Sequence, residues 1–294
     1  MIHKPLSLQG QEMNTTIIHG SGNTAIFSIG SDDVTIEQMT IKEGFMGIHI
    51  ENSNSIQIQQ TTIIDQYIGI EIQGSSNIQI HENEITGIDV YGIHIIMSSE
   101  HDSNSLIISN NLIQNNEQGI FLADGQDHNI YENIITENQV GLSLFMTNGE
   151  PSIIENNQIK ENNDGIILYS EALKSPIIIQ HNTIIQNYNA GISCFVDPST
   201  FLSEEHTALI QYNNIYQNQQ QAYMYLTVNG LSDIWNIFNG RRSLFHSNYW
   251  ATTSTSPYPI PADMSVFIGI IPQLIYQGTL IWGYDTDPAI EPYQ

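Results

Sequence analysis

Histidine, glutamate and aromatic residues recur at two fixed distances after a repeated glycine, and they are the residues in this chain best suited to hold a ligand. Two residues after successive glycines lie His49, Glu71, His94, Phe121, Ser143, Ile167 and Ser193. Four residues after the same glycines lie Glu51, Gln73, Ile96, Ala123, Phe145, Tyr169 and Phe195. Aromatic rings pack against the C–H faces of sugars, while carboxylates, amides and imidazoles bond sugar hydroxyl groups. The pattern therefore predicts a carbohydrate-binding groove lined by His49, Glu51, Glu71, Gln73, His94, Phe121, Phe145, Tyr169 and Phe195.

Three other interpretations of these residues stay open. Long segments follow the same strands, at 97–105, 146–152, 169–175 and 197–207, and could fold over the aromatic rings to bury them as a second core. His49, Glu71 and His94 could bind a metal ion. On alternate rungs of a sheet, however, the two histidine backbones lie roughly 10 Å apart, which favours a hydrogen-bonded ladder. Glu51 and Glu71 could form a carboxylate pair, about 5 to 9 Å apart, for glycoside cleavage.

Acidic residues in two neighbouring loops suggest a calcium site. Asp102 precedes Asp124 and Asp127 by one repeat, so these carboxylates could lie on adjacent rungs together with loop carbonyl groups. Calcium takes six to eight oxygen ligands at about 2.3 to 2.6 Å, which such groups could supply. A solvated acidic loop is the alternative. Calcium is the only cofactor that the sequence suggests.

Short strands in a repeating unit must position these residues. The glycines are Gly47, Gly69, Gly92, Gly119, Gly141, Gly165 and Gly191, at steps of 22 to 27 residues, and Ala25 and Ala222 fit one repeat before and after them. The residues one and three positions after each glycine are mostly apolar, and they alternate with the candidate ligand-binding residues at positions two and four. An alternation of two residues is the period of a β-strand. Two more isoleucine columns, from Ile36 to Ile210 and from Ile41 to Ile215, mark two further strands. The repeat predicts an all-β, single-stranded, right-handed parallel β-helix of roughly ten coils.

Two columns of asparagine support this fold. One contains Asn83, Asn111, Asn133, Asn157, Asn182 and Asn213, and the other contains Asn116, Asn138, Asn162, Asn187 and Asn218. Asparagine tolerates the left-handed backbone of tight turns, and its amide can bond the same amide one coil away. A polar side chain inside a solenoid must be satisfied by its neighbours, so we interpret these residues as ladders of the scaffold.

The composition limits the partners of the chain. Six Lys+Arg against thirty-one Asp+Glu give a net charge of −25, which repels nucleic acid and anionic membranes and disfavours polyanionic substrates. Cys194 is the only cysteine and lies at an inward position, so we expect a core residue and no disulfide within the chain. No run of 18 apolar residues occurs, so the chain is not expected to span a membrane. Residues 1–14 lack the pattern of a signal peptide and start inside a first coil, as in a trimmed longer parent.

One elongated domain is expected, in two parts. Residues 1–235 form the parallel β-helix repeats, and residues 236–294 form a terminal coil and a C-terminal cap packed on the same domain. Beyond Ala222 the period fails, and Trp235, Phe238, Phe245, Tyr249 and Trp250 crowd together. An uncapped last coil would expose strand edges that promote aggregation.

The repeats and the C-terminal segment carry a family resemblance. The Asn-x-Ile and Asn-x-Gly-Ile patterns resemble the parallel β-helix repeats of NosD-type proteins. Asn248-Tyr249-Trp250, residues 257–261 and residues 287–293 resemble the C-terminal end of archaeal NosD-like surface proteins, although residues 251–256 replace the Asp/Gly-rich insert of those relatives. The resemblance covers nearly the whole chain. It implies a pectin-lyase-like fold and an extracytoplasmic location: extracellular, cell-surface or periplasmic.

This resemblance implies carbohydrate binding or processing, or, for NosD itself, assistance in copper-site maturation of nitrous oxide reductase. Copper favours clustered soft or imidazole ligands, whereas eight Met and ten His are scattered here without a Met-x-x-Met motif or a Cys pair. Enzymes that this fold resembles use basic residues beside calcium or clustered Asp motifs, and the candidate face has neither, so no catalytic residue is assigned. We predict a monomeric, non-catalytic module that binds a glycan or polysaccharide, or serves adhesion or structure. A polysaccharide-active enzyme (glycoside hydrolase, lyase or epimerase) and a copper-maturation factor are the alternatives.

Overall fold

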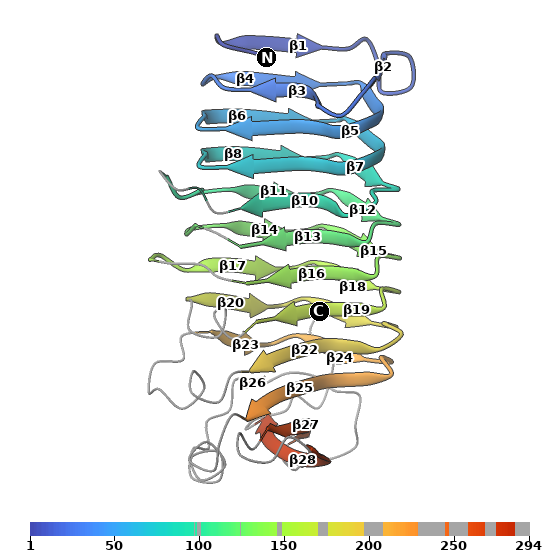
Figure 1. The fold of residues 1–294 in the computed structure, drawn as a ribbon, viewed down its shortest axis with the longest axis vertical. Coiled ribbons are helices and arrows are strands. Elements are labelled where there is room, and N and C mark those ends of the chain that lie inside the picture. The colour runs from blue at the N-terminus through green and yellow to red at the C-terminus, as the bar shows by residue number, and fades with distance from the viewer. Residues whose placement is uncertain are drawn as a thin grey trace.

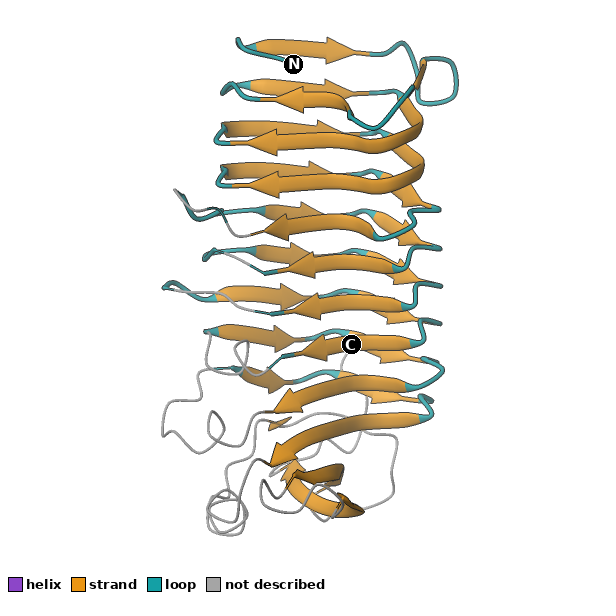
Figure 2. Ribbon diagram, viewed as in Figure 1, coloured by secondary structure: helices purple, strands orange, loops and turns teal. Residues whose placement is uncertain are grey.

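The structure, a computed structural model, is a parallel β-helix in which each coil lies on the next (Figure 1). It describes residues 1–96, 98, 101–123, 125–145, 149–169, 176–196 and 208–228, together with strands at 245–246, 258–267 and 275–285. The regular elements within these residues are strands joined by short turns (Figure 2). None of the described residues belongs to a helix that could cross a membrane. The predicted all-β solenoid is confirmed.

Three parallel walls form the solenoid, and the second and third walls are one sheet that is continuous through β5 and β7. The first contains β1 (Leu6–Gln9), β4 (Val34–Glu37), β6 (Asn54–Gln59), β8 (Ser76–His81), β11 (Ile107–Ser109), β14 (Asn129–Tyr131), β17 (Ser152–Glu155), β20 (Ile177–Gln180), β23 (Leu209–Gln211) and β26 (Phe245–His246). The second, called the glycine sheet because most of its strands carry the repeated glycines, contains β3 (Ala25–Ile29), β5 (Thr40–Glu51), β7 (Thr62–Gln73), β10 (Tyr91–Ile96), β13 (Gln118–Leu122), β16 (Val140–Leu144), β19 (Asp164–Leu168), β22 (Ala190–Val196) and β25 (Gln220–Val228). The third contains β2 (Ile17–His19), the first parts of β5 and β7, β9 (Glu84–Thr86), β12 (Leu112–Gln114), β15 (Ile134–Thr136), β18 (Gln158–Lys160), β21 (Thr183–Ile185) and β24 (Asn214–Tyr216). Beside β25, β27 (Tyr258–Phe267) extends the glycine sheet in parallel, and β28 (Ile275–Asp285) pairs with β27 antiparallel.

Stacked isoleucines form the core. Strand register places Ile36, Ile58, Ile80, Ile108, Ile130, Ile154, Ile179 and Ile210 in one column. The second predicted column, from Ile41 to Ile215, also places one residue on each coil, and members of both columns are at most 1% exposed. β-Branched side chains suit such stacked strands, and their burial drives folding. Cys194 is buried as predicted, and burial raises the pKa of its thiol to about 12, so it is an inert core residue.

The repeated glycines are required by the close stacking of the coils. A β-carbon at Gly69 would lie 2.4 Å from the carbonyl oxygen of Gly92, and one at Gly119 would lie 2.5 Å from the carbonyl oxygen of Gly141. Any larger residue would therefore push neighbouring coils apart. This contact explains why glycine marks the repeat in the sequence.

Both asparagine ladders are present and buried. In the first ladder, each side chain donates from Nδ2 to the Oδ1 of the asparagine on the next coil, at 2.9–3.1 Å. The second ladder repeats this bond at 2.7–3.1 Å. Each Oδ1 also accepts a hydrogen bond from a backbone N–H; for Asn157 the donor is the N–H of Asn133, at 3.0 Å. Each Nδ2 also donates to a backbone carbonyl; for Asn157 the acceptor is the carbonyl of Ile130, at 2.8 Å. The scaffold interpretation of these residues is confirmed.

Left-handed backbone lies one residue earlier than the asparagine pattern predicts. Glu132 and Asn156, which precede ladder residues Asn133 and Asn157, have φ angles of 55° and 56°. The residue before each of the other ladder asparagines also has a positive φ. The preceding residue makes the turn, so that the asparagine itself can direct its amide into the solenoid.

The sequence pattern misplaces both ends of the glycine column by one residue. Ala25 pairs with Met46 rather than with Gly47, and Ala222 pairs with Ile192, so that it lies in the inward column and is fully buried. Alanine is both small and apolar. Its type alone therefore does not distinguish the glycine column from the core column beside it.

The division after residue 235, the count of ten coils and the C-terminal cap stay predictions. Of the aromatic residues that suggested the cap, Trp235, Phe238, Tyr249 and Trp250 lie outside the described residues. Phe245 lies in β26, in parallel register with Ile210 of β23.

Removing one ladder amide should destabilise the solenoid strongly. In Asn157→Ala, the backbone N–H of Asn133 and the carbonyl of Ile130 lose buried partners, at about 1–3 kcal/mol each. We expect a loss of about 3 kcal/mol in the free energy of unfolding, measured by urea denaturation. The control is Gln158→Ala, the exposed next residue, which should change this free energy by less than about 0.5 kcal/mol. Equal losses in the two variants would contradict the ladder's role.

Candidate functional site

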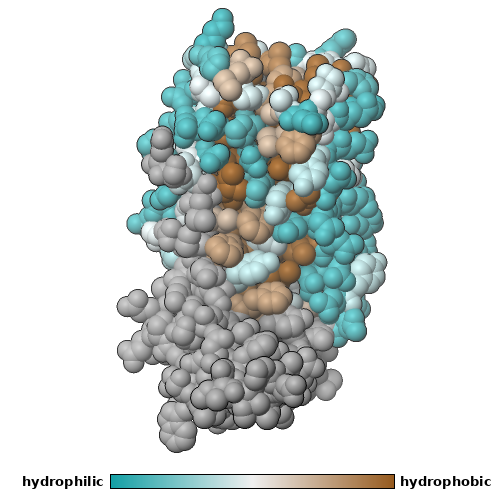
Figure 3. All heavy atoms as spheres, viewed as in Figure 1, coloured by the Kyte–Doolittle hydropathy of each residue, from teal (hydrophilic) through white to brown (hydrophobic). Residues whose placement is uncertain are grey.

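The candidate residues lie on the outer face of the glycine sheet. Strand register stacks His49, Glu71, His94, Phe121, Ser143, Ile167 and Ser193 in one column, as predicted. In the second column, Glu51 pairs with Gln73, and Gln73 pairs with Ile96. Figure 3 views this face and shows apolar residues along its middle, between hydrophilic flanks. The backbone therefore brings the two predicted columns to one surface.

Glu71 lies between two histidines from the coils on either side. His94 donates from Nδ1 to Oε2 of Glu71 at 3.0 Å, and Nε2 of His49 lies 3.7 Å from Oε1. The three side chains are only 14–21% exposed. Only the contact with His94 is a hydrogen bond, because 3.7 Å to His49 is longer than a hydrogen bond. Because a carboxylate only accepts, Nδ1 of His94 is the donor in this bond.

Two aromatic rings complete this group, which we call the Glu71 cluster: His49, Glu71, Tyr91, His94 and Phe121. The Tyr91 ring stacks on the imidazole of His94 with centroids 4.0 Å apart, and the Phe121 ring lies edge-on to it at 5.5 Å. The sequence grouped Phe121 with the other aromatic residues. In the structure its ring contacts are within this cluster, to His94 and to Tyr91 at 5.3 Å.

Tyr91 was missed because strict alternation would direct it inward. Ladder pairing passes from Tyr91 to Ile93 without Gly92, so the alternation is interrupted at the glycine. The residue before the glycine then shares the outer face with the residue two positions after it. The interruption occurs where glycines on neighbouring coils are in close contact. In the sequence, only the glycine itself indicates it.

Three aromatic residues, which we call the aromatic row, follow one another along the edge of the glycine sheet: Phe145, Tyr169 and Phe195. Phe145 directly follows β16, Tyr169 directly follows β19, and Phe195 lies near the end of β22. Successive ring centroids are 5.7 and 5.6 Å apart. Phe145 and Tyr169 are half-buried and Phe195 is 37% exposed, so these rings are not part of the interior core. Most of the long segments that could cover them lie outside the described residues.

A carboxylate on the strand that leads to Tyr169 was also missed. Oδ1 of Asp164 accepts from Nδ2 of Asn189 at 2.8 Å and from Oγ of Ser193 at 3.2 Å. Burial raises the pKa of Asp164, and these two hydrogen bonds oppose that rise. Asp164 precedes its glycine, as Tyr91 does, so the same interruption of alternation explains the omission. Burial also raises the pKa of Tyr169, whose hydroxyl stays protonated at neutral pH.

Two family models match the chain. One, described as "Periplasmic copper-binding protein (NosD)", matches residues 90–255, which is more than half of the sequence. The chain belongs to the NosD family. The other, described as "Right handed beta helix region", matches residues 8–154 and agrees with the predicted hand of the solenoid.

This NosD-family chain also aligns with solved structures at low sequence identity. The A-module of the mannuronan C-5 epimerase AlgE4 from Azotobacter vinelandii aligns over 96% of this chain and 79% of its own, with a TM-score of 0.57 and 15% identity. An alginate lyase from Paenibacillus sp. aligns over 76% of this chain and 78% of its own, with a TM-score of 0.45 and 12% identity. The likeness to the epimerase A-module shows the fold alone. No curated protein matches the chain by sequence.

The described side chains do not fit the copper centre that the NosD description suggests. Among them, no group of three His, Cys, Asp or Glu residues is placed to hold a metal ion. Two soft ligands, Cys194 and Met39, are buried in the core. Nε2 of His49 and Nδ1 of His94 face the two oxygens of the Glu71 carboxylate, so these nitrogens are directed at an acidic side chain.

The calcium site stays a prediction. Asp124 lies outside the described residues. Asp102 is exposed, and Asp127, which has a φ of 57°, accepts at Oδ2 from Oγ of Ser105 at 2.8 Å.

The raised pKa of Asp164 should make its contribution to stability depend on pH. The folded protein holds the proton more tightly than the unfolded chain, whose aspartates titrate near pH 3.9. The resulting stabilisation is complete below that pH and is lost as pH rises through the folded-state pKa. Asp164→Asn keeps the Oδ1 acceptor and cannot ionise. We therefore expect the free energy of unfolding of this variant, relative to the unmodified chain, to increase from about pH 4 to pH 7.

Urea denaturation at several pH values measures this difference. The control is Asp89→Asn, which changes an exposed aspartate of the same chain. An equal pH trend in both variants, or none in Asp164→Asn, would contradict the assignment.

Proposed function

We propose that this NosD-family chain is an extracytoplasmic, non-catalytic module that binds a neutral polysaccharide along the outer face of the glycine sheet. The aromatic row is the observation that supports this most directly. Its rings follow one another at 5.7 and 5.6 Å, one on each coil. One coil spacing, about 4.8 Å, is close to the length of one pyranose unit in a polysaccharide. Each ring could therefore meet the C–H face of a successive sugar.

Polar groups beside the row supply the bonds that sugar hydroxyls need. The Asp164 carboxylate is held by Asn189 and Ser193, and its half-buried position keeps it from being fully solvated. On the coils before it, the half-buried amide of Gln118 is held by the buried Ser143, whose hydroxyl donates to Oε1 of Gln118 at 2.9 Å. Preorganised polar groups of this kind fix orientation, while the aromatic faces contribute contact area.

The charge of the chain favours a neutral ligand. A net charge of −25 opposes the approach of a polyanion, and the Glu71 cluster and Asp164 place carboxylates on the binding face itself. The fold neighbour from Azotobacter vinelandii is titled a mannuronan epimerase, and mannuronan is a polyanion. This chain has six Lys+Arg in all, so we infer a different class of glycan. The periplasmic description of the NosD family supports the extracytoplasmic location.

One observation favours a second candidate, acid–base catalysis on the bound glycan. The bond from His94 to Glu71, at 3.0 Å, orients the imidazole, whose side chain is 14% exposed, and leaves Nε2 outside this bond. A carboxylate–histidine pair of this kind could remove a proton from water or from a sugar. The enzyme alternative therefore depends on Glu71.

Removing two rings of the aromatic row should weaken glycan retention while the fold persists. Each aromatic stacking contact contributes about 0.5–1.5 kcal/mol, so Phe145→Ala with Tyr169→Ala should weaken binding about 10-fold or more. Retention on a glycan array, followed by titration calorimetry of the best neutral hit, measures the loss. Because both rings are only half-buried, the melting temperature should fall by no more than a few degrees.

The matched control is a second stacked pair, Phe45 with Tyr67, whose ring centroids are 5.0 Å apart at the bends of β5 and β7. By interstrand spacing, Tyr67 lies about 14 Å and Phe45 about 19 Å along the stack from the first residue of the row. Phe45→Ala with Tyr67→Ala should leave binding unchanged. Unfolding of the Phe145/Tyr169 variant would instead identify those rings as core, and equal losses in both variants would contradict the assignment of the site.

Glu71→Gln separates binding from catalysis. If incubation with a retained glycan yields shortened or unsaturated products, this variant should remove product formation while it keeps retention, because glutamine cannot hold His94 as a carboxylate does. Mass spectrometry of the glycan after incubation with the unmodified chain and with Glu71→Gln measures product formation by each. An intact glycan after incubation with the unmodified chain supports the non-catalytic module. Unchanged product formation by Glu71→Gln would contradict the acid–base role.

A further inference from the structure

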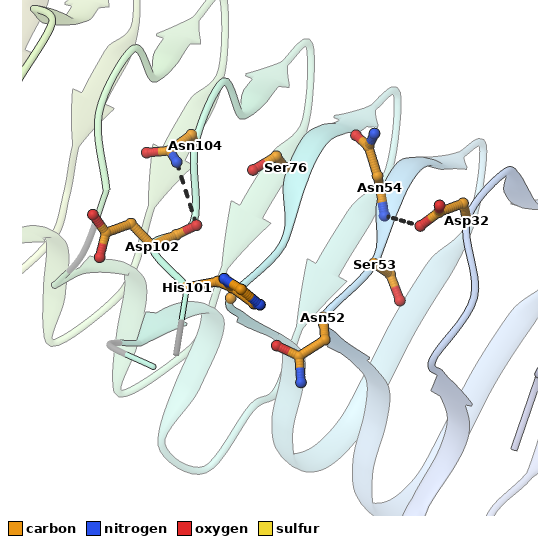
Figure 4. A pocket seen from close by; sticks show the side chains of 9 residues that line it. Asp32, Asn52, Ser53, Asn54, Ser76, His101, Asp102 and Asn104 are labelled. Carbon is orange, nitrogen blue, oxygen red and sulfur yellow. Dashed lines mark hydrogen bonds between the residues drawn. The ribbon is translucent and has the colours of Figure 1, made fainter. Parts of the chain in front are cut away.

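A polar pocket of about 550 Å³ opens at the turns that follow β5, β7 and β10 (Figure 4). Its polar lining includes Asp32, Asn52, Asn54, His101, Asp102 and Asn104. These turns leave the glycine sheet at the ends of its strands, which is the edge that carries the aromatic row farther along the stack. The pocket and the row therefore lie along the same edge of the solenoid.

The backbone keeps this pocket open. Asn52 and Gly74 occupy successive turns and both have left-handed φ angles, of 48° and 56°. A β-carbon at Gly74 would lie 2.8 Å from Oδ1 of Asn52 and 3.2 Å from the carbonyl oxygen of His101. The glycine thus leaves space between the side chain of one coil and the loop of another.

Part of the polar lining is fixed, and part of it is unused. Oδ1 of Asp32 accepts from the backbone N–H of Asn54 at 2.7 Å, and Oδ1 of Asn104 accepts from the backbone N–H of Gln126 at 3.2 Å. The side-chain amide of Asn52, the His101 ring and the Asp102 carboxylate have no hydrogen-bond partner among the described residues. All three residues line the pocket, and Figure 4 shows the Asn52 amide and the His101 ring, a mixture of donors and acceptors, with the Asp102 carboxylate directed away from them.

This mixture matches the hydroxyl groups of a neutral sugar, which both donate and accept. A bound metal ion is less suitable, because no three metal-binding side chains are grouped among the described residues. An anionic ligand would meet the carboxylates of Asp32 and Asp102. The volume is within the range of small-ligand sites.

We infer that the pocket is a distal subsite that binds a sugar unit of the same polysaccharide chain whose other end lies on the aromatic row. This rests on the proposed function. The loop after β10 lines the pocket, and the aromatic row begins on the coil of β16. The distance between these two coils is two strand spacings, about 10 Å. About two pyranose units bridge that distance, past Ile96 and Ala123. A chain of about six units would reach from the row into the pocket.

Affinity should therefore depend on glycan length in a stepwise way. Trimers reach only the aromatic row, and hexamers and longer chains reach both parts. Once a glycan is bound to the aromatic row, its contact with the pocket is intramolecular. The hydrogen bonds in the pocket should therefore make the affinity for the hexamer about 10-fold or more higher than the affinity for the trimer. The probes are β-1,4-linked gluco- and manno-oligosaccharides from dimer to octamer, measured by titration calorimetry.

The variant His101→Ala with Asp102→Asn should remove this step and leave trimer affinity unchanged. Both side chains are exposed, so the fold should persist, and circular dichroism checks it. The matched control, His3→Ala with Asp89→Asn, alters exposed residues outside the pocket and should keep the step. Binding that does not rise with length, or a step that survives in the pocket variant, overturns this inference alone. Absence of binding to every oligomer and to every neutral glycan on an array overturns the proposed function as well.

Discussion

The structure depends on the satisfaction of buried amides at a coil spacing of about 4.8 Å. Each turn between sheets leaves backbone N–H and C=O groups inside the molecule without strand partners. Asn157 shows how they are satisfied: its Oδ1 accepts from the backbone and side chain of Asn133, and its Nδ2 donates to Ile130 and Asn182. Because this contact recurs on successive coils, the spacing is uniform. The outward side chains are held at the same spacing, which makes a periodic ligand surface possible.

The inward positions are constrained by this stacking, so the outward positions determine what the surface can bind. Along one column the side chain changes from His49 through Phe121 to Ser193, while the parallel register is unbroken. The same backbone can therefore carry acid–base, aromatic or polar groups. For this reason the likeness to a mannuronan epimerase fixes the architecture and leaves the ligand to be argued from this chain's own surface.

Patterns that repeat on each coil were predictable from sequence, and breaks in the pattern were not. The isoleucine columns, the asparagine ladders and the stacking of His49 on Glu71 follow from period and alternation alone. Tyr91 and Asp164 were missed because alternation is interrupted at the glycines, where coils approach too closely for a side chain. The pocket was missed for a different reason: it joins turns on several coils, and only Asp102 had been singled out for a ligand. Its shape depends on the left-handed turns at Asn52 and Gly74, which periodicity does not encode.

Variation in coil length is concentrated at the edge that carries both parts of the proposed site. The long connections, from β10 to β11, β16 to β17, β19 to β20 and β22 to β23, all leave the ends of glycine-sheet strands. At the other turns, the ladder amides must meet their partners on every coil, so insertions there would break buried hydrogen bonds. The first turn after the glycine sheet carries neither of the two asparagine ladders. A shorter column of buried residues, including Ser75, Ser103 and Ser152, bonds backbone N–H groups at this turn, and the added residues at 97–102 precede Ser103 and leave that column in place. The aromatic row and the polar pocket therefore lie at the edge where coil length varies.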